Sequence, residues 1–317
     1  AMTCAVAAMP LAASQAQIVL KGGHISPKDS VEGIAIDRFA DLVKARTNGQ
    51  IAMQIFPSEQ LGKSVSQIDS TAIGNQDMFF AGSPEMERFS PGLRLLGLNW
   101  VVPSVESFRK VTKDPVWNEI LHEPLNKAGF VALASNWERG PYRVMVTTKP
   151  ITSLDDLKGM KLRVPDAPLY TMFPRAVGAN PTPMAFSEVF TSLQNGTIEG
   201  QENPLALFKS GGFYEVQKVV NKTEHVRSWI YLTISERSWG KLSEADQAAL
   251  LEAAKRTQAY ERELFLADET ALVADLEGRG VTFVEVDQAA FAAKARDAVI
   301  GSVAEELRPM VEQIFNN

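Results

Sequence analysis

The chain has 317 residues, of which 45% are hydrophobic and 22% charged, and its formal net charge is −6. This length exceeds what one compact core usually holds, so we expect two lobes. The mildly acidic balance and the lack of a Lys/Arg cluster argue against nucleic acid as a partner and against a membrane-surface helix.

Residues 1–16 are free of charged side chains and rich in small ones. The pattern is typical of the end of a secretory signal peptide that is cleaved after Ala16; a disordered or helical extension is the alternative. Cys4 is the only cysteine and lies in this segment, so we expect no disulfide and no thiol chemistry in the mature protein. No other stretch approaches the ~20 apolar residues of a membrane span, which predicts a soluble exported protein.

From Gln17 onward, short apolar runs alternate with helical periodicity, which predicts an α/β fold. In the first part of the chain the expected strands and helices follow one another in a simple order. The strands are 18–20, 51–56 and 77–81, and the helices are 31–43, 65–72 and one that begins at Pro115.

A second unit begins near Gly140, with expected strands at 143–147 and 161–164 and short helices at 153–159 and 187–193. No linker of low complexity separates the two units, so we expect them to be interwoven. Residues 243–277 contain no proline or glycine and begin with a capping pattern, Ser243 and Asp246. They form either one helix of about 50 Å that crosses both lobes or two helices separated by a turn.

Chemistry typical of enzymes is absent from the sequence. His24, His122 and His225 are far apart, and no pair has the spacing of metal ligands. Motifs for nucleotide phosphates, for dinucleotides and for a serine nucleophile are also missing. We therefore expect no metal, no cofactor and no catalysis.

Arg163 lies at a position where its side chain needs an anionic partner. It lies in a predicted strand that is otherwise built to be buried, and a buried guanidinium is costly unless it meets an anion. Its planar fork fits a carboxylate through two parallel hydrogen bonds. The anion could belong to a ligand or to an Asp or Glu of the chain itself.

A second notable segment runs from residue 180 to residue 205 and is punctuated by prolines and glycines. Within it, Gln201, Glu202 and Asn203 gather polar groups beside apolar neighbours. Asn203 precedes a proline, which favours an extended backbone and could hold its amide at the wall of a cleft. A turn with a self-bonded Asn is the alternative.

These two segments resemble the solute-binding subunits of tripartite ATP-independent periplasmic (TRAP) transporters, the DctP-like family. The resemblance rests on three linked motifs at matching intervals, and weaker similarity extends from about Gln17 to the C-terminus. The motifs are Lys161-Leu162-Arg163-Val164-Pro165, Pro181-Thr182-Pro183-Met184-Ala185-Phe186 and Gln201-Glu202-Asn203-Pro204-Leu205.

The resemblance implies a two-lobed periplasmic binding protein fold with hinge strands and a long lobe-crossing helix. Lobe I would comprise residues 17–139 plus about 229–268, and lobe II residues 140–228 plus about 269–317. The implied protein is a periplasmic monomer that captures a small organic acid and delivers it to the permease subunits in the membrane.

The resemblance also assigns roles in the cleft. The principal carboxylate clamp falls on Arg163 and the second arginine on Arg143, with Arg139 as the alternative. The cleft asparagine falls on Asn203 and the packing aromatic on Phe186.

Lobe I should contribute His24 and the loop that carries Ser83 and Glu85. Sialic-acid-binding members of the family have a Glu where this chain has Gly82 and an Arg where it has Glu85, which argues against sialic acid. A ligand-facing Glu85 suits hydroxyl or ammonium donors and favours a sugar acid such as an aldonate or uronate; a solvent-facing loop charge is the alternative. Trp137 could stack on a sugar face or pack in the hinge.

Two other functions would fit part of this picture. A periplasmic sensor subunit would share the cleft but report to a kinase, and a carbohydrate-acid enzyme would convert its ligand rather than return it intact.

Overall fold

A computed structural model describes residues 17–90, 93, 97, 100, 102, 104–111, 113, 115–227, 229–302, 305 and 308. The expected signal segment, residues 1–16, lies outside the described residues. The strands are β1 (Ile18–His24), β2 (Ile51–Phe56), β3 (Met78–Gly82), β4 (Phe130–Glu138), β5 (Arg143–Thr147), β6 (Lys161–Val164), β7 (Asn180–Pro183), β8 (Gly200–Pro204), β9 (Val219–Val226), β10 (Trp229–Ser235) and β11 (Thr282–Val284).

The described residues form ten α-helices and four 3₁₀ helices. They are α1 (Val31–Arg46), α2 (Ser64–Ala72), α4 (Val105–Val111), α5 (Pro115–Lys127), α6 (Leu169–Ala176), α7 (Val189–Gln194), α8 (Leu205–Ser210), α9 (Glu236–Trp239), α10 (Glu244–Gly278) and α11 (Gln288–Ser302), together with the 3₁₀ helices η1 (Ser83–Met86), η2 (Leu154–Leu157), η3 (Phe186–Glu188) and η4 (Phe213–Glu215).

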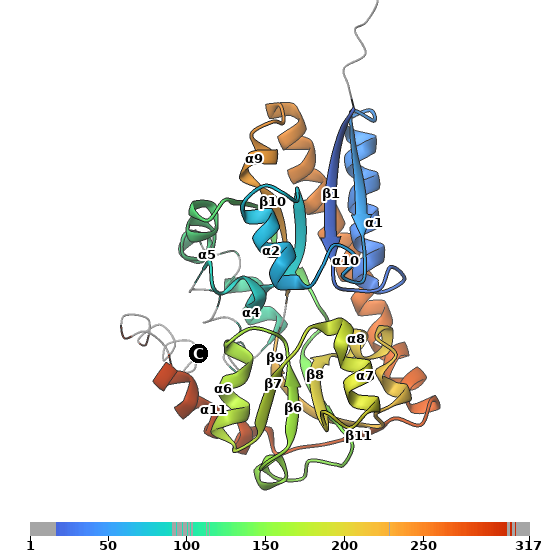
Figure 1. The fold of residues 1–317 in the computed structure, drawn as a ribbon, viewed down its shortest axis with the longest axis vertical. Helices are drawn as coiled ribbons and strands as arrows, with labels where there is room; N and C mark the ends of the chain where they lie inside the picture. The colour runs from blue at the N-terminus through green and yellow to red at the C-terminus, as the bar shows by residue number, and fades with distance from the viewer. Residues whose placement is uncertain are drawn as a thin grey trace, which may run out of the picture.

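Two separate mixed sheets organise the chain (Figure 1). The first has the strand order β2-β1-β3-β10-β4; we call this sheet with its helices lobe I. The second has the order β11-β9-β5-β8-β6-β7 and forms lobe II with its helices. Strands 130–138, 200–204, 219–226 and 229–235 were not among the expected elements, whereas the expected strands 51–56, 143–147 and 161–164 have the predicted bounds.

The two lobes are joined where the chain crosses twice at neighbouring positions. β4 of lobe I leads into β5 of lobe II, and β9 of lobe II leads back into β10 of lobe I. Glu138 pairs with Trp229 on the lobe I side, and Arg143 pairs with Val226 on the lobe II side. The two crossings therefore lie side by side and form a hinge of paired strands.

Helix α10 is the third connection and is continuous over 35 residues. At 1.5 Å per residue it is about 50 Å long. Its N-terminus is capped by Ser243, whose hydroxyl accepts the N–H of Asp246 at 3.2 Å. Its first half packs on α1 and β4 of lobe I, and its last turns place Leu272 and Leu276 in a core of lobe II. Of the two sequence interpretations, the single lobe-crossing helix is the one observed (Figure 1).

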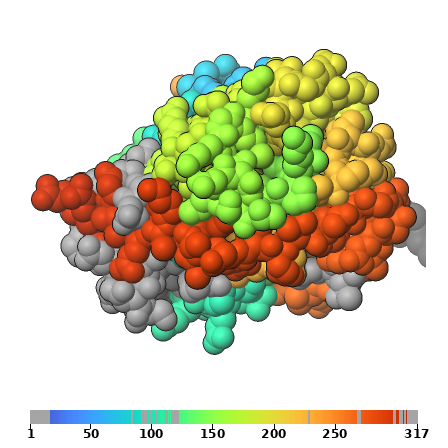
Figure 2. All heavy atoms as spheres, turned by 90° about the horizontal axis from the view of Figure 1, so that it is seen from below, coloured from blue at the N-terminus to red at the C-terminus, as the bar shows by residue number. Residues whose placement is uncertain are grey.

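Each sheet is covered by helices on both faces. In lobe I, one core packs Phe39 of α1 against Trp137, and the other packs Phe79 and Phe130 with neighbouring side chains. In lobe II, α11 packs on α6 and β9. Figure 2 shows this C-terminal part of the chain as a band across the lower face of lobe II. None of the helices in the described part of the chain combines the length and apolarity that a membrane crossing needs.

Candidate ligand site between the lobes

A cavity of about 220 Å³ lies between the two lobes. Lobe I contributes the start of α2 and one side chain of η1, and lobe II contributes the end of β6, the end of β7 and η3. The lining residues are Lys63, Ser64, Val65, Glu85, Arg163, Pro165, Asp166, Pro183, Met184, Ala185, Phe186 and Glu188. A cavity of this size, walled by both lobes and by charged groups of both signs, can enclose a small polar molecule.

Arg163 forms part of the lobe II wall and is only 2% exposed. Its Nε and Nη2 both donate to the carbonyl oxygen of Met184, at 3.1 and 2.7 Å. Its Nη1 is buried and has no hydrogen-bond partner, and no ion pair of Arg163 is found among the described residues. Burial lowers the pKa of Arg163 to about 10 although Glu202 and Glu85 oppose this shift. The chain has buried a cation and left one of its nitrogens unsatisfied at the cavity.

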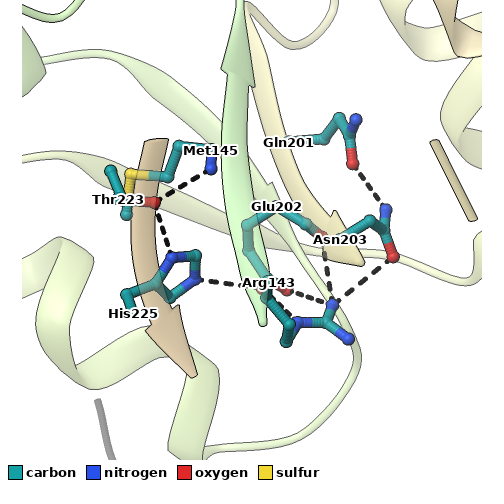
Figure 3. A network of polar contacts seen from close by, with 7 residues as sticks. All are labelled: Arg143, Met145, Gln201, Glu202, Asn203, Thr223 and His225. Carbon is teal, nitrogen blue, oxygen red and sulfur yellow. Dashed lines mark hydrogen bonds and ion pairs between the residues drawn. The ribbon is translucent and has the colours of Figure 1, made fainter. Parts of the chain in front are cut away.

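Arg143 lies two strands away in the same sheet and is bound by the chain itself (Figure 3). Its Nε and Nη2 donate to the two carboxylate oxygens of Glu202, with the Nη2–Oε1 distance 2.7 Å. Its Nη2 also approaches Oδ1 of Asn203 at 3.4 Å, and its guanidinium lies 4.8 Å from the centre of the Tyr170 ring. Both Arg143 and Asn203 are buried, and neither lines the cavity. Their predicted contacts with a ligand stay a prediction.

His225 supports this ion pair from the other side (Figure 3). Its Nε2 lies 3.3 Å from Glu202 Oε2, and its Nδ1 lies 2.8 Å from the Thr223 hydroxyl, which accepts the backbone N–H of Met145. Burial by itself would raise the pKa of Glu202, but Arg143 and His225 outweigh burial and hold that pKa at about 2. Because burial also lowers the pKa of His225, the neutral ring donates from Nε2 to Glu202 and accepts from Thr223 at Nδ1.

On the lobe I side, Glu85 is half-buried and lines the cavity as expected from the loop position. Its Oε2 accepts the backbone N–H of Gly82 at 3.0 Å, and burial raises the pKa of its carboxyl group. Ser83 begins η1 beside it, and its side chain lies outside what the structure describes.

Two other residues assigned to the cleft do not line the cavity. His24 ends β1 and is 2% exposed; its Nδ1 has no hydrogen-bond partner, and burial lowers the pKa of its ring to about 4. Trp137 is fully buried in the lobe I core, where it meets Phe39 edge to face. In this structure Trp137 packs, which was the alternative to stacking on a sugar. Phe186, by contrast, lines the cavity and packs on Phe213 behind it.

Contacts between the lobes surround the mouth of the cavity. Lys63 Nζ of lobe I lies 2.5 Å from Glu188 Oε1 of lobe II, and both residues line the cavity. Glu59 accepts the backbone N–H of Ser187 at 3.1 Å. The lobes thus touch each other directly in this structure.

Sequence reasoning did not single out Lys63, Asp166 or Glu188 as site residues. Two of them closely follow the motifs named above: Asp166 comes after Pro165, and Glu188 comes two positions after Phe186. Their closeness arises from the way the lobes face each other, which no local pattern encodes. Within the described residues, no group of three or more His, Cys, Asp or Glu side chains could hold a metal ion.

Comparisons with known proteins match the chain to solute-binding proteins. The family model described as bacterial extracellular solute-binding protein, family 7, matches residues 22–306. A crystal structure of a TRAP periplasmic solute-binding protein from Roseobacter denitrificans, with bound L-galactonate, is 45% identical; the match covers 95% of this chain and 100% of that chain, with a TM-score of 0.91.

Two further relatives match over nearly as much of the chain. A TRAP solute-binding protein from a Polaromonas species, bound to D-erythronate, is 32% identical over 94% of this chain and 98% of that chain, with a TM-score of 0.89. The 2,3-diketo-L-gulonate-binding periplasmic protein of Escherichia coli is 31% identical over 90% of this chain and 87% of that protein.

Proposed function

The chain belongs to family 7 of the bacterial extracellular solute-binding proteins, as a TRAP solute-binding protein, and from this premise we propose that it captures a sugar acid in the cavity between its lobes. Membership in this family confirms the resemblance and the two-lobed α/β fold expected from the sequence. The family consists of binding proteins, so the proposed action is capture without chemical change.

A single observation carries the proposal. Arg163 is buried in the cavity wall, touches no carboxylate among the residues that the structure describes and has an Nη1 without a hydrogen-bond partner there. An incoming carboxylate would supply the anion that burial of the guanidinium demands, through charge-assisted hydrogen bonds. Phe186 supplies an apolar wall beside it, and Glu85 offers an acceptor for ligand hydroxyl groups from lobe I.

The class of ligand is supported by the relatives as well as by the cavity. L-Galactonate and D-erythronate, bound by the two similar crystal structures, are polyhydroxy monocarboxylates. The acidic side chains Glu85, Asp166 and Glu188 around the cavity suit hydroxyl donors and disfavour a second carboxylate. Because a ligand would contact both lobes, it would favour the state in which they touch.

The first test is a thermal-shift panel with L-galactonate, D-erythronate, D-galacturonate and succinate, followed by calorimetry. A ligand that binds only the folded state raises the apparent melting temperature. We expect at least one sugar acid to bind, and Arg163→Lys to weaken its affinity at least tenfold because an ammonium group loses the planar fork. Arg256→Lys is the matched control, since Arg256 is exposed on α10. Equal affinity in Arg163→Lys and wild type would remove Arg163 from the clamp role.

Two finer aspects belong to the same proposal: export to the periplasm through residues 1–16, and delivery of the ligand to membrane permease subunits. Uptake of the radiolabelled ligand into vesicles that contain the permease should require the binding protein. Mass spectrometry of the released ligand should recover it unchanged, whereas an enzyme would convert it.

A further inference from the structure

Arg139 lies at the lobe I end of the hinge, directly after β4, and is 4% exposed. Its Nε donates to Oε1 of Glu32 at 2.6 Å, and Glu32 is itself buried near the start of α1. Glu32 also accepts a hydrogen bond from the hydroxyl of Ser26. One side of the Arg139 guanidinium is therefore fixed within lobe I and is not directed at the carboxylate clamp formed in lobe II.

The other side of this guanidinium occupies the space above Gly82. A Cβ atom added to Gly82 would lie 2.6 Å from Arg139 Nη1 and 3.5 Å from Glu85 Oε2. The guanidinium and the cavity-lining carboxylate therefore flank the same residue, which has no side chain, although no direct ion pair joins these two described groups. Any other residue at position 82 would have to displace the end of Arg139, because real Cβ contacts are not found below 3.0 Å.

The electrostatics of Glu85 agree with this geometry. Burial raises the pKa of the Glu85 carboxyl group, and among the cations that oppose burial Arg139 acts more strongly than Arg143 or Arg163. Arg139 thus lies between two carboxylates. Glu32 anchors it, and Glu85 presents its carboxylate to the cavity.

We propose that Arg139 is a positioning residue whose charge draws the Glu85 carboxylate toward the cavity, and that Gly82 is a specificity determinant because a side chain there would displace the end of Arg139. The proposal rests on the proposed function, in which Glu85 accepts hydroxyl hydrogen bonds. A fixed carboxylate opposite Arg163 selects ligands that have an acid group at one end and hydroxyl groups at the other, and it repels a second acid group.

Gly82→Ala is the sharpest test, because it displaces the tip of Arg139 while every charged residue stays in the chain. The matched control is Gly278→Ala at the end of α10, where an added Cβ meets nothing within 4 Å. We expect Gly82→Ala to weaken L-galactonate binding about tenfold, at the lower end of what a hydrogen bond to a charged group contributes. Binding of succinate should not weaken, so the ratio of the succinate dissociation constant to the L-galactonate dissociation constant should fall about tenfold.

A cycle with Glu85→Gln separates positioning from a general structural effect. If Gly82 acts through Arg139 and Glu85, then adding Gly82→Ala to Glu85→Gln should change L-galactonate affinity less than twofold. Full additivity of the two substitutions would overturn the proposal. The double variant Arg139→Gln/Glu32→Gln removes the buried pair without leaving one charge unpaired, and it should match Gly82→Ala in ligand selectivity.

A measurement without ligand keeps this inference distinct from the proposed function. In ¹³C-labelled protein, the Glu85 carboxyl signal can be assigned by its loss in Glu85→Gln and titrated. Its pKa should be higher in Gly82→Ala than in wild type, because the cation that opposes burial has moved away. An unchanged pKa overturns the role of Arg139 even if sugar acids bind. A raised pKa in a protein that binds no sugar acid would uphold the role of Arg139 and refute the proposed function.

Discussion

Arg143 and Arg163 are the same residue type, lie in strands of the same sheet and are both at most 2% exposed, yet they are in opposite electrostatic situations. Arg143 holds a fork with Glu202, whereas Arg163 reaches only the carbonyl of Met184 and keeps one nitrogen unpartnered. Arg163 lines the cavity and Arg143 does not. An arginine in a buried strand therefore indicates a binding site only where no carboxylate of the described residues forms an ion pair with it.

The physical reason is the cost of burying charge. Removing a guanidinium from water costs several kcal/mol, and a well-placed carboxylate recovers this cost. At Arg143 the chain recovers it during folding. At Arg163 part of the cost is not recovered by the described residues, and under the proposed function the carboxylate of an acid ligand would recover it.

The largest expected effect tests the paired side of this comparison. Arg143→Met should lower the free energy of unfolding by about 3–5 kcal/mol, because it leaves the buried Glu202 carboxylate without its cation. Urea denaturation followed by circular dichroism measures the change.

The control for that variant is Arg143→Met/Glu202→Gln, which removes both charges. Most of the lost stability should return in the double variant, because no unpaired charge then remains. If Arg143→Met alone cost less than about 1 kcal/mol, the ion pair would be structurally unimportant and the contrast with Arg163 would fail.

His24 extends the comparison to a buried group without a partner at Nδ1. Its pKa is lowered to about 4 in the folded protein, against an ordinary value of 6.5, so the folded state keeps the ring neutral. The contribution of neutral His24 to the free energy of unfolding is complete above pH 6.5. It is lost as the pH falls toward 4, because His24 then binds a proton in the unfolded chain but not in the folded protein.

The corresponding measurement is stability as a function of pH in wild type and in His24→Gln. Between pH 7 and pH 5.5, wild type should lose about 1.2 kcal/mol more than the variant. His122 and His225, whose pKa values burial also lowers, remain in both proteins and cancel in the difference. Parallel curves for the two proteins would show that His24 titrates normally in the folded state.

Arg163→Met tests the unpaired side of the comparison with the opposite sign. Without ligand, this variant should be about 1 kcal/mol more stable than wild type, because a buried and incompletely satisfied charge is replaced by an apolar side chain. Arg163→Lys should show no such gain, because it keeps a charge. Destabilisation by Arg163→Met comparable to that of Arg143→Met would mean that the Met184 carbonyl satisfies Arg163 after all.

The sequence allowed much of the architecture to be predicted, because hydrophobic periodicity is local. The strand at 161–164 and the capped start of α10 follow directly from their own residues. Strand β8 did not, because Gln201, Glu202 and Asn203 are polar and yet wholly buried. Only their partners explain this burial, and Arg143 and His225 lie far away in the sequence.

Part of the cavity lining was predictable for the same reason, whereas the ligand contacts of its residues stay a prediction. Arg163 and Phe186 could be assigned because each belongs to a local motif whose meaning survives without the rest of the fold. The pairing of Arg143 with Glu202, the burial of Trp137 in the lobe I core and the meeting of Lys63 with Glu188 all depend on how distant segments pack. A sequence pattern indicates which interactions a side chain can make. The fold determines whether another group of the chain already satisfies them.

The smallest expected effect concerns the ion pair between Lys63 and Glu188 at the cavity mouth, which differs from Arg143–Glu202 in being exposed to solvent at 59% and 47%. Water screens such a pair, so Lys63→Met should weaken ligand binding by no more than about threefold, mainly through faster dissociation. The reversed pair Lys63→Glu/Glu188→Lys should bind nearly as tightly as wild type, and the loss in Lys63→Met should shrink at high salt. A loss of tenfold or more that is insensitive to salt would instead place Lys63 in direct contact with the ligand. In that case burial would not explain which charged residues contribute strongly to stability or binding and which contribute weakly.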